Sequence, residues 1–178
     1  MSGDFVIRPE RVSDHAEIEA VVRAAFTRHP DDVALLVERI RASENYIPGL
    51  AVVAVDDSGV LAHTMLSWVG LENSSRERIL NLSPMSVRPD RQRQGIGSRL
   101  IRSVLERAEA AGEPAVMVEG IPDYYPQFGF ERARTLGFVA PSESIPDAAF
   151  MVKRLAGYDP SLAGAVVYPP AFDHLSQG

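Results

Sequence analysis

The spacing of apolar residues along the chain predicts its first elements. Residues 5–8 alternate between apolar and polar in the manner of a strand, which Pro9 ends. From residue 13 to about residue 28, apolar residues recur every three or four positions, and this spacing predicts an amphipathic helix. A second, shorter helix is expected from Asp31 to Ile40, with acidic residues at the positive end of its dipole.

Apolar strands joined by turns follow the two helices. Pro48–Gly49 is expected to break the chain, and residues 50–55 form a compact apolar strand. Asp56–Gly59 is a typical hairpin turn, because glycine supplies the positive φ that the loop needs. Return strands are expected over residues 60–71 and 78–87. Consecutive strands linked by turns predict an antiparallel meander.

Helical spacing returns between residues 95 and 111, and Gly112 is expected to end that helix. Residues 115–118 are short and apolar, which is typical of a buried strand. The order strand, helix, strand predicts a right-handed parallel crossover between the strands at 78–87 and 115–118. The expected fold class is therefore α/β, an α+β mixed sheet in which an antiparallel meander precedes a parallel β-α-β crossover.

The last part of the chain carries weaker patterns. A short helical turn is expected over residues 123–128, and a final hairpin has its surest strand at 149–155. The tail, residues 156–178, has no clear period, so we expect irregular structure packed on the surface. A chain of 178 residues, 46% of them hydrophobic, is expected to form a single domain, residues 1–178, with its core at about 4–155.

Composition narrows the chemistry. The chain has no cysteine, which excludes disulfides, thiolate metal sites and a cysteine nucleophile, and weakly favours a cytoplasmic location. No metal site is expected. No apolar run approaches the roughly 18 to 20 residues that span a bilayer, and the start of the chain lacks the basic and apolar parts of a signal peptide. We therefore expect an unprocessed, soluble protein without membrane contact.

The net charge of −6 argues against nucleic acid as a partner, because duplex binding requires a basic face. The segment from Arg88 to Arg102 nevertheless holds five arginines and one acid, Asp90, so it carries +4 while the rest carries −10. Such a segment indicates a small anionic ligand, although charge alone would also fit a solvated helix face. The arginines best suited to phosphate oxygens are Arg88, Arg91 and Arg93.

Residues 82–100 carry the most specific local pattern: a strand, an arginine-rich loop and a helix with Gly95 and Gly97 at its start. Free backbone N–H groups at a helix start form an anion site, and glycines let a phosphate approach closely. A Walker loop is excluded because the only lysine is Lys153, and the dinucleotide fingerprint lacks its third glycine. Nucleoside triphosphate hydrolysis and nicotinamide binding are therefore both disfavoured.

The pattern Gln92-x-x-Gly95-x-Gly97 resembles motif A of the GNAT N-acetyltransferase superfamily. Downstream, Tyr124–Phe130 is similar to the Tyr-x-x-x-Gly-Phe of that family's motif B. The resemblance covers about residues 4–155. It implies a GNAT-like acyl-CoA acyltransferase fold with splayed central strands, between which the cosubstrate acetyl-CoA lies.

The resemblance also implies which residues contact acetyl-CoA. Backbone N–H groups from Gln92 to Ser98 would cradle the pyrophosphate, and the backbone of Met85 and Val87 would pair with the thioester carbonyl and the pantetheine amides. Pro84 cannot donate to a sheet ladder, so it is expected either to end a strand or to mark a bulge that leaves N–H groups free for a ligand. The implied cofactor-binding residues are Met85, Ser86, Val87, Gln92, Arg93, Gln94, Gly95, Ile96, Gly97 and Ser98.

Acyl transfer to an amine needs a base for the amine, a donor for the developing oxyanion and an acid for the departing thiolate. Tyr125 matches the motif B tyrosine, so the resemblance implies that it is the acid, with Tyr124 as the alternative. Glu119, at the end of a buried strand, is the expected base. Glu72, His63 and a water relay remain open for that role.

The sequence therefore predicts an N-acetyltransferase that transfers the acetyl group directly from acetyl-CoA to a primary amine of a small molecule or protein. The acidic body favours cationic acceptors such as polyamines or aminoglycosides. The alternatives are a non-catalytic acyl-CoA-binding regulatory module and an enzyme acting on aminoacyl-tRNA, which the charge of −10 outside the arginine segment disfavours. Trp68 is expected in the core rather than beside the acceptor. The oligomeric state stays open, with a homodimer among the options.

Overall fold

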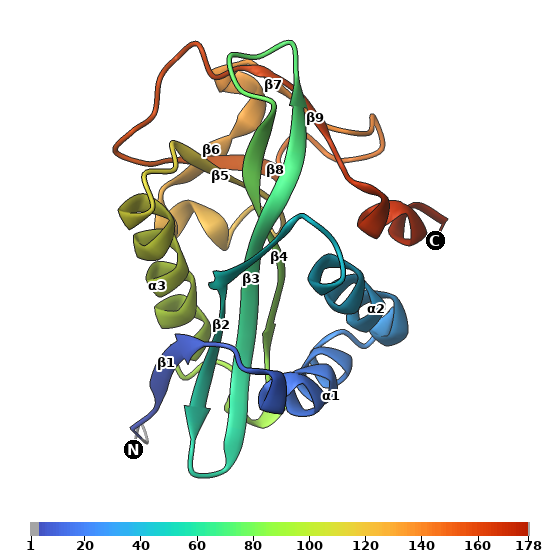
Figure 1. Ribbon diagram of the computed structural model, residues 1–178, viewed down its shortest axis with the longest axis vertical. Helices are drawn as coiled ribbons and strands as arrows, with labels where there is room; N and C mark the ends of the chain where they lie inside the picture. Colours follow the sequence, from blue (N-terminus) through green and yellow to red (C-terminus); the bar gives the residue numbers. More distant parts are fainter. Residues whose placement is uncertain (1–3, 178) are drawn as a thin grey trace.

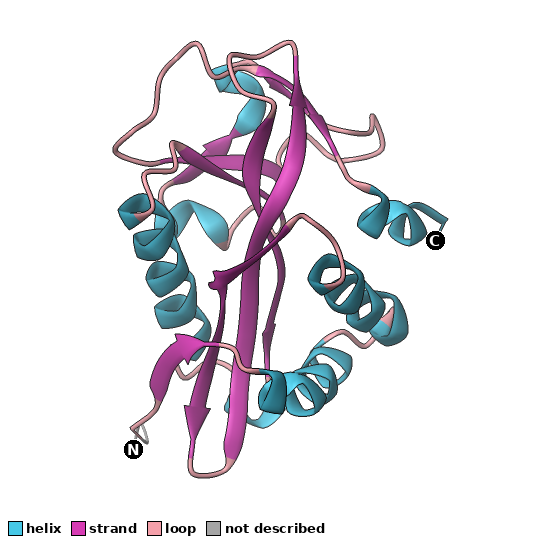
Figure 2. Ribbon diagram, viewed as in Figure 1, coloured by secondary structure: helices cyan, strands magenta, loops and turns pink. Residues whose placement is uncertain are grey.

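The computed structural model describes residues 4–177 and arranges them around one mixed sheet (Figures 1 and 2). Residues 1–3, which belong to the start of the chain where no signal peptide is expected, lie outside the described part. The strands are β1 (Val6–Pro9), β2 (Tyr46–Asp56), β3 (Gly59–Glu72), β4 (Arg78–Val87), β5 (Ala115–Glu119), β6 (Phe130–Arg132), β7 (Phe138–Val139), β8 (Phe150–Arg154) and β9 (Gly164–Val167). The α-helices are α1 (His15–Ala25), α2 (Pro30–Arg41) and α3 (Ile96–Ala110). Short 3-10 helices are η1 (Val12–Asp14), η2 (Pro89–Arg91), η3 (Tyr125–Phe128), η4 (Ala133–Leu136) and η5 (Pro170–Gln177).

The strand order confirms the meander and the crossover. The main path of the sheet runs β1-β2-β3-β4-β5-β8-β6, and neighbours are antiparallel except for the parallel pair β4 and β5. Helix α3 connects those two strands and covers one face of the sheet, whereas α1 and α2 cover the other (Figure 1). Within the described residues, no helix is long and apolar enough to cross a bilayer.

Because helices cover both faces, the central strands bury side chains on both sides. In β2, Ala51 and Val53 pack in the core beneath α1 and α2, while Val52 and Ala54 pack in the core beneath α3. This explains why the strand is apolar throughout instead of alternating. Helix α3 contributes one buried stripe to its core, with members Ile96, Leu100, Ile101, Val104, Leu105 and Ala108.

Strand β2 starts earlier than expected. The predicted break at Pro48–Gly49 is wrong, because β2 begins at Tyr46 and runs through both residues. Its pairing with β3 shifts register between Tyr46 and Ala51. That irregularity accommodates a proline, which has no N–H to give to the ladder.

The tail also departs from the prediction of irregular structure. Strand β9 pairs antiparallel with the end of β3, with Leu71 opposite Val166, and parallel with β7. Strand β3 extends past its pairing with β2, so its last residues offer a free edge that β9 occupies. A four-residue strand is too short to show a period, which is why the pattern did not reveal it.

Candidate active site

Strands β4 and β5 separate near the middle of the sheet. Their ladder ends where Leu82 lies opposite Val118. On the β3 side, Met85 lies opposite Thr64 and Leu82 lies opposite Leu66, so β4 holds one residue more than β3 across this stretch. The extra residue lies in Ser83–Pro84, which confirms the expected bulge near Pro84 and opens the sheet toward β5.

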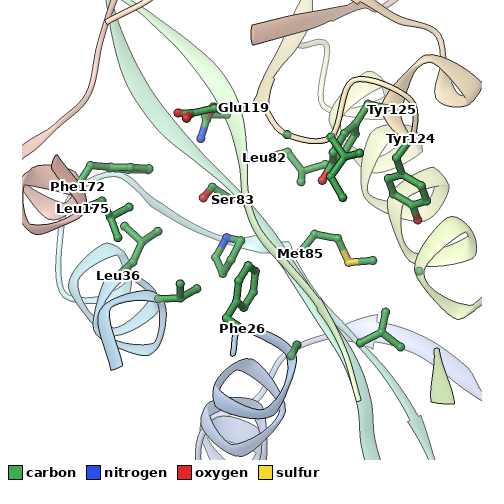
Figure 3. A pocket seen from close by; sticks show the side chains of 18 of the residues that line it. Phe26, Leu36, Leu82, Ser83, Met85, Glu119, Tyr124, Tyr125, Phe172 and Leu175 are labelled. Atoms are coloured by element: carbon green, nitrogen blue, oxygen red, sulfur yellow. The ribbon is translucent and has the colours of Figure 1, made fainter. Parts of the chain in front are cut away.

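A cavity of about 1170 Å³ occupies this opening (Figure 3). Met85, Tyr124 and Tyr125 lie on one side of it, while Leu36, Phe172 and Leu175 lie on the other. We call the first side, beside α3, the loop half; its lining includes Met85, Val87, Arg91, Gln92, Arg93, Gly95, Ile96, Gly97, Ser98, Tyr124 and Tyr125. We call the second side the tail half; its lining includes Ala25, Phe26, Val33, Leu36, Ile145, Val166, Tyr168, Phe172 and Leu175.

The loop half presents unpaired backbone donors. Gly95 caps α3 in the left-handed region, with φ +79°, and a Cβ there would meet no atom within 4 Å. The first N–H groups of an α-helix, here those of Ile96 to Ser98, have no intrahelical acceptor. Within residues 4–177, no hydrogen bond engages the backbone N–H groups of Arg93 to Gly95 either. These amides and the helix dipole form a site for a phosphate group.

Gly97 allows α3 to approach β4. A Cβ on Gly97 would lie 2.5 Å from Cε of Met85 and 3.3 Å from Cγ2 of Val87. It would also lie 3.2 Å from the Tyr124 hydroxyl. Any side chain at this position would therefore crowd the loop half.

Two of the five arginines of the cationic segment form salt bridges with acids. Arg88 forms a salt bridge with Asp90 at 2.7 Å and does not line the cavity. Arg91 lines it but also binds Asp56 at 2.9 Å. Hydrogen bonds from Ser58, together with Arg91, lower the pKa of that Asp56 carboxyl to about 2. Arg93 also lines the cavity, and no salt bridge joins it to any residue in the described chain.

Most of the residues expected to contact the cofactor line the cavity, and Ser86 and Gln94 do not. Ser86 points to the opposite face of β4, where its hydroxyl donates to the carbonyl of His63 at 3.3 Å. The Gln94 side chain turns back to the carbonyl of Asp90 at 3.2 Å. Those that line it are Met85, Val87, Gln92, Arg93, Gly95, Ile96, Gly97 and Ser98.

Tyr125 brings its hydroxyl to the cavity. Its side chain is 7% exposed, and its ring makes edge-to-face contacts with Tyr124 and Phe130. Burial, with a smaller effect of Tyr124, raises the pKa of Tyr125 to about 12. No hydrogen bond within residues 4–177 uses its hydroxyl. A Cβ on Gly120 would lie 2.3 Å from the Tyr125 ring, so the ring fits only against glycine.

Among the described residues that line the cavity, Glu119 is the only acid. It ends β5, one residue beyond the last pair of the β4–β5 ladder. The Tyr168 hydroxyl donates to its Oε2 at 3.1 Å. Burial, followed by the nearby Glu119 charge, raises the pKa of Tyr168 well above its usual value, so that hydroxyl remains a donor.

The alternative bases lie away from the cavity. His63 is fully buried, and its Nε2 lies 2.9 Å from Oε2 of Glu10, which also forms a two-point salt bridge with Arg41 at 2.8 Å. Burial lowers the pKa of His63, so the ring stays neutral. Glu72 is exposed at the end of β3 and does not line the cavity. Trp68 packs against the core beneath α3, with the Arg78 guanidinium 4.2 Å from its ring centroid.

Two features of the site escaped sequence reasoning. Asn81 lines the cavity with 1% exposure, and its side-chain oxygen has no partner within the described chain. A polar residue between Leu80 and Leu82 in an apolar strand was the available signal. Tyr168 and Phe172 come from the tail, where no pattern pointed to the site. The part of the chain that the structure describes holds no group of three or more His, Cys, Asp or Glu side chains that could bind a metal.

Comparison with known proteins gives consistent matches. Residues 48–132 match the family model described as an acetyltransferase (GNAT) domain. The uncharacterized N-acetyltransferase YjhQ of Escherichia coli is 30% identical over 161 residues, 86% of each chain. Among solved structures, the GNAT family N-acetyltransferase YhbS of Escherichia coli in complex with CoA has a TM-score of 0.85 at 29% identity, covering 95% of this chain and 92% of that one. A GNAT family acetyltransferase of Brucella melitensis in complex with acetyl-CoA has a TM-score of 0.76 at 32% identity, covering 96% and 99%.

Proposed function

Because the chain belongs to the GNAT family of acetyl-CoA-dependent N-acetyltransferases, we propose that it transfers the acetyl group directly to the primary amine of a small molecule. One arrangement carries the proposal: a hydroxyl without a partner, on Tyr125, and a carboxylate, on Glu119, line the same cavity where β4 and β5 separate. Direct transfer needs an acid and a base on opposite sides of one reacting centre. It needs no cysteine, and the chain has none.

The loop half fits the cosubstrate. Unpaired N–H groups from Arg93 to Ser98 offer donors to a pyrophosphate, and the open space at Gly95 leaves room for its approach. Arg93 adds a positive charge beside them. Acetyl-CoA, when bound, supplies an acetyl group activated as a thioester. In this proposal the backbone of β4 at Met85 and Val87, next to the bulge, holds the part of the molecule that leads to the thioester.

In this proposal Glu119 and Tyr125 each carry out one of the two proton transfers. Glu119 accepts a proton from the incoming ammonium or amine, and the Tyr168 hydroxyl keeps that carboxylate in place. Tyr125 donates a proton to the departing sulfur, because its raised pKa keeps the hydroxyl protonated at neutral pH. The Asn81 amide, buried and without a partner for its oxygen, is positioned to receive a hydrogen bond from the amine.

Release of CoA from acetyl-CoA in the presence of an amine panel tests the proposal. Glu119→Gln should lower kcat by about 10² to 10⁴, the usual contribution of a general base. Glu72→Gln is the matched control, because Glu72 is an exposed strand-end acid outside the cavity. Equal losses in both variants would remove Glu119 from the role of base. Binding of acetyl-CoA without CoA release for any amine would favour a non-catalytic acyl-CoA-binding module instead.

A further inference from the structure

The tail half of the cavity has apolar walls built by segments distant in sequence. Phe26 comes from the end of α1 and Leu36 from α2, while Phe172 and Leu175 come from η5 (Figure 3). Ile145 and Val166 complete the wall from the loop before β8 and from β9. Two of the serines that line the cavity, Ser142 and Ser144, form a hydrogen bond of 2.8 Å with each other. An acceptor in this half therefore contacts mainly hydrocarbon.

The tail half, which we also call the chamber, has its charged and amide side chains at the end nearest the sheet. Glu119 is the only acid among the lining residues that the structure describes, and Asn81 lies on β4 within the β4–β5 ladder. The arginines in the described part of the lining, Arg91 and Arg93, belong to the loop half. The chamber thus offers one counter-charge for one ammonium group.

The tail supplies part of the cavity wall, and it also orients the Glu119 carboxylate. The Tyr168 ring stacks on Phe172, with centroids 4.7 Å apart and planes at 23°. The Tyr168 hydroxyl donates to Glu119. The aromatic pair therefore faces the acceptor, while the Tyr168 hydroxyl holds the exposed carboxylate of Glu119 at the end of β5.

We propose that the acceptor is a primary amine on an apolar alkyl or aryl group with a single positive charge, and not a polyamine or an aminoglycoside. This inference rests on the proposed function and adds the class of its substrate. One ammonium pairs with Glu119, whereas a second would sit against the buried side chains of Phe172 and Leu36 without a partner. An unpaired charge removed from water is strongly disfavoured. The acidic body favours cations at the surface, but the chamber selects against a second charge.

Hexylamine and hexamethylenediamine test the inference, because they share one chain length and differ in a second terminal amine. The kcat/KM for CoA release should be at least about a hundredfold higher for hexylamine. Equal or higher values for the diamine, spermidine or an aminoglycoside would overturn the inference and leave the proposed function intact. Failure of every amine, despite binding of acetyl-CoA, would overturn the proposed function and the inference with it.

A variant pair locates the selectivity in the chamber. Leu175→Glu places a second carboxylate on the wall at a half-exposed position, so the protein should still fold. It should lower the ratio of kcat/KM for hexylamine to kcat/KM for hexamethylenediamine by at least about tenfold. Val139→Glu is the control, because Val139 is 60% exposed and lies outside the cavity lining. An unchanged ratio in Leu175→Glu, with acetyl-CoA still raising the melting temperature, would contradict the chamber as the source of selectivity.

Discussion

Tyr125→Phe removes the hydroxyl proposed to protonate the departing sulfur and leaves the rest of the side chain in place. The ring keeps its edge-to-face contacts with Phe128 and Phe130. The hydroxyl has no hydrogen-bond partner in the described chain, so its removal leaves no protein group unsatisfied. The free energy of unfolding should therefore change by less than about 0.5 kcal/mol.

The effect on catalysis should be far larger. A general acid contributes about 10² to 10⁴ to the rate, so kcat should fall at least about a hundredfold, equivalent to about 2.7 kcal/mol of the barrier. Affinity for acetyl-CoA should stay the same, because the amides from Arg93 to Ser98, which we propose bind its pyrophosphate, are untouched. Because the pKa of Tyr125 is raised to about 12, the wild-type rate should not decline through ionisation of this hydroxyl until the pH nears that value.

Three measurements decide this prediction: CoA release followed with a thiol-reactive dye, thermal unfolding, and calorimetric titration with acetyl-CoA. Tyr124→Phe is the matched control, since the Tyr124 hydroxyl lies beside Gly97 in the loop half. An unchanged kcat in Tyr125→Phe would refute the acid role. A large loss in Tyr124→Phe alone would transfer that role to the neighbouring tyrosine.

The remaining predictions concern the phosphate site and the buried salt bridge. Gly97→Glu should abolish the rise in melting temperature caused by acetyl-CoA, because it adds bulk and negative charge at the proposed phosphate site. Gly49→Glu is the control and should preserve that rise, since a Cβ on Gly49 meets nothing within 4 Å. Equal melting-temperature shifts in the two variants would contradict the proposed phosphate site. Glu10→Ala should lower the free energy of unfolding by about 3 to 5 kcal/mol in denaturant melts, since Arg41 is left half-buried and unpaired; a loss below about 1 kcal/mol would count against this. Stability should fall as the pH drops below 6.5, the ordinary pKa of histidine, because burial lowers the pKa of His63 and only the unfolded chain then binds its proton; His63→Gln should flatten that slope.

Local patterns predicted the part of the site that lies on consecutive residues. The end of β4, the loop and the start of α3 form one stretch of chain, so spacing and glycine positions sufficed to place Gly95 and Gly97. Glu119 was predicted because it ends a recognisable strand, whereas Tyr125 was predicted from its match to the motif B tyrosine. Burial, and with it the raised pKa of Tyr125, could not be deduced without the fold.

Long-range pairing determined what the sequence did not reveal. The sequence predicted Arg91 as a partner for phosphate, yet Asp56, 35 residues earlier, pairs with it across the β2–β3 turn. His63 occupies a strand position that looks accessible, but Glu10 from the start of the chain pairs with it in the core. The tail reaches the cavity because β9 pairs with the end of β3, and that pairing brings Tyr168 to Glu119.

The most direct test of the central claim is the fate of the acetyl group when the protein, acetyl-CoA and hexylamine are mixed and analysed by mass spectrometry. Transfer through the cavity between β4 and β5 predicts equal amounts of N-acetylhexylamine and free CoA, with no acetyl group left on the protein. Bound acetyl-CoA with no acetylated amine, or an acetylated protein in its place, would contradict direct transfer.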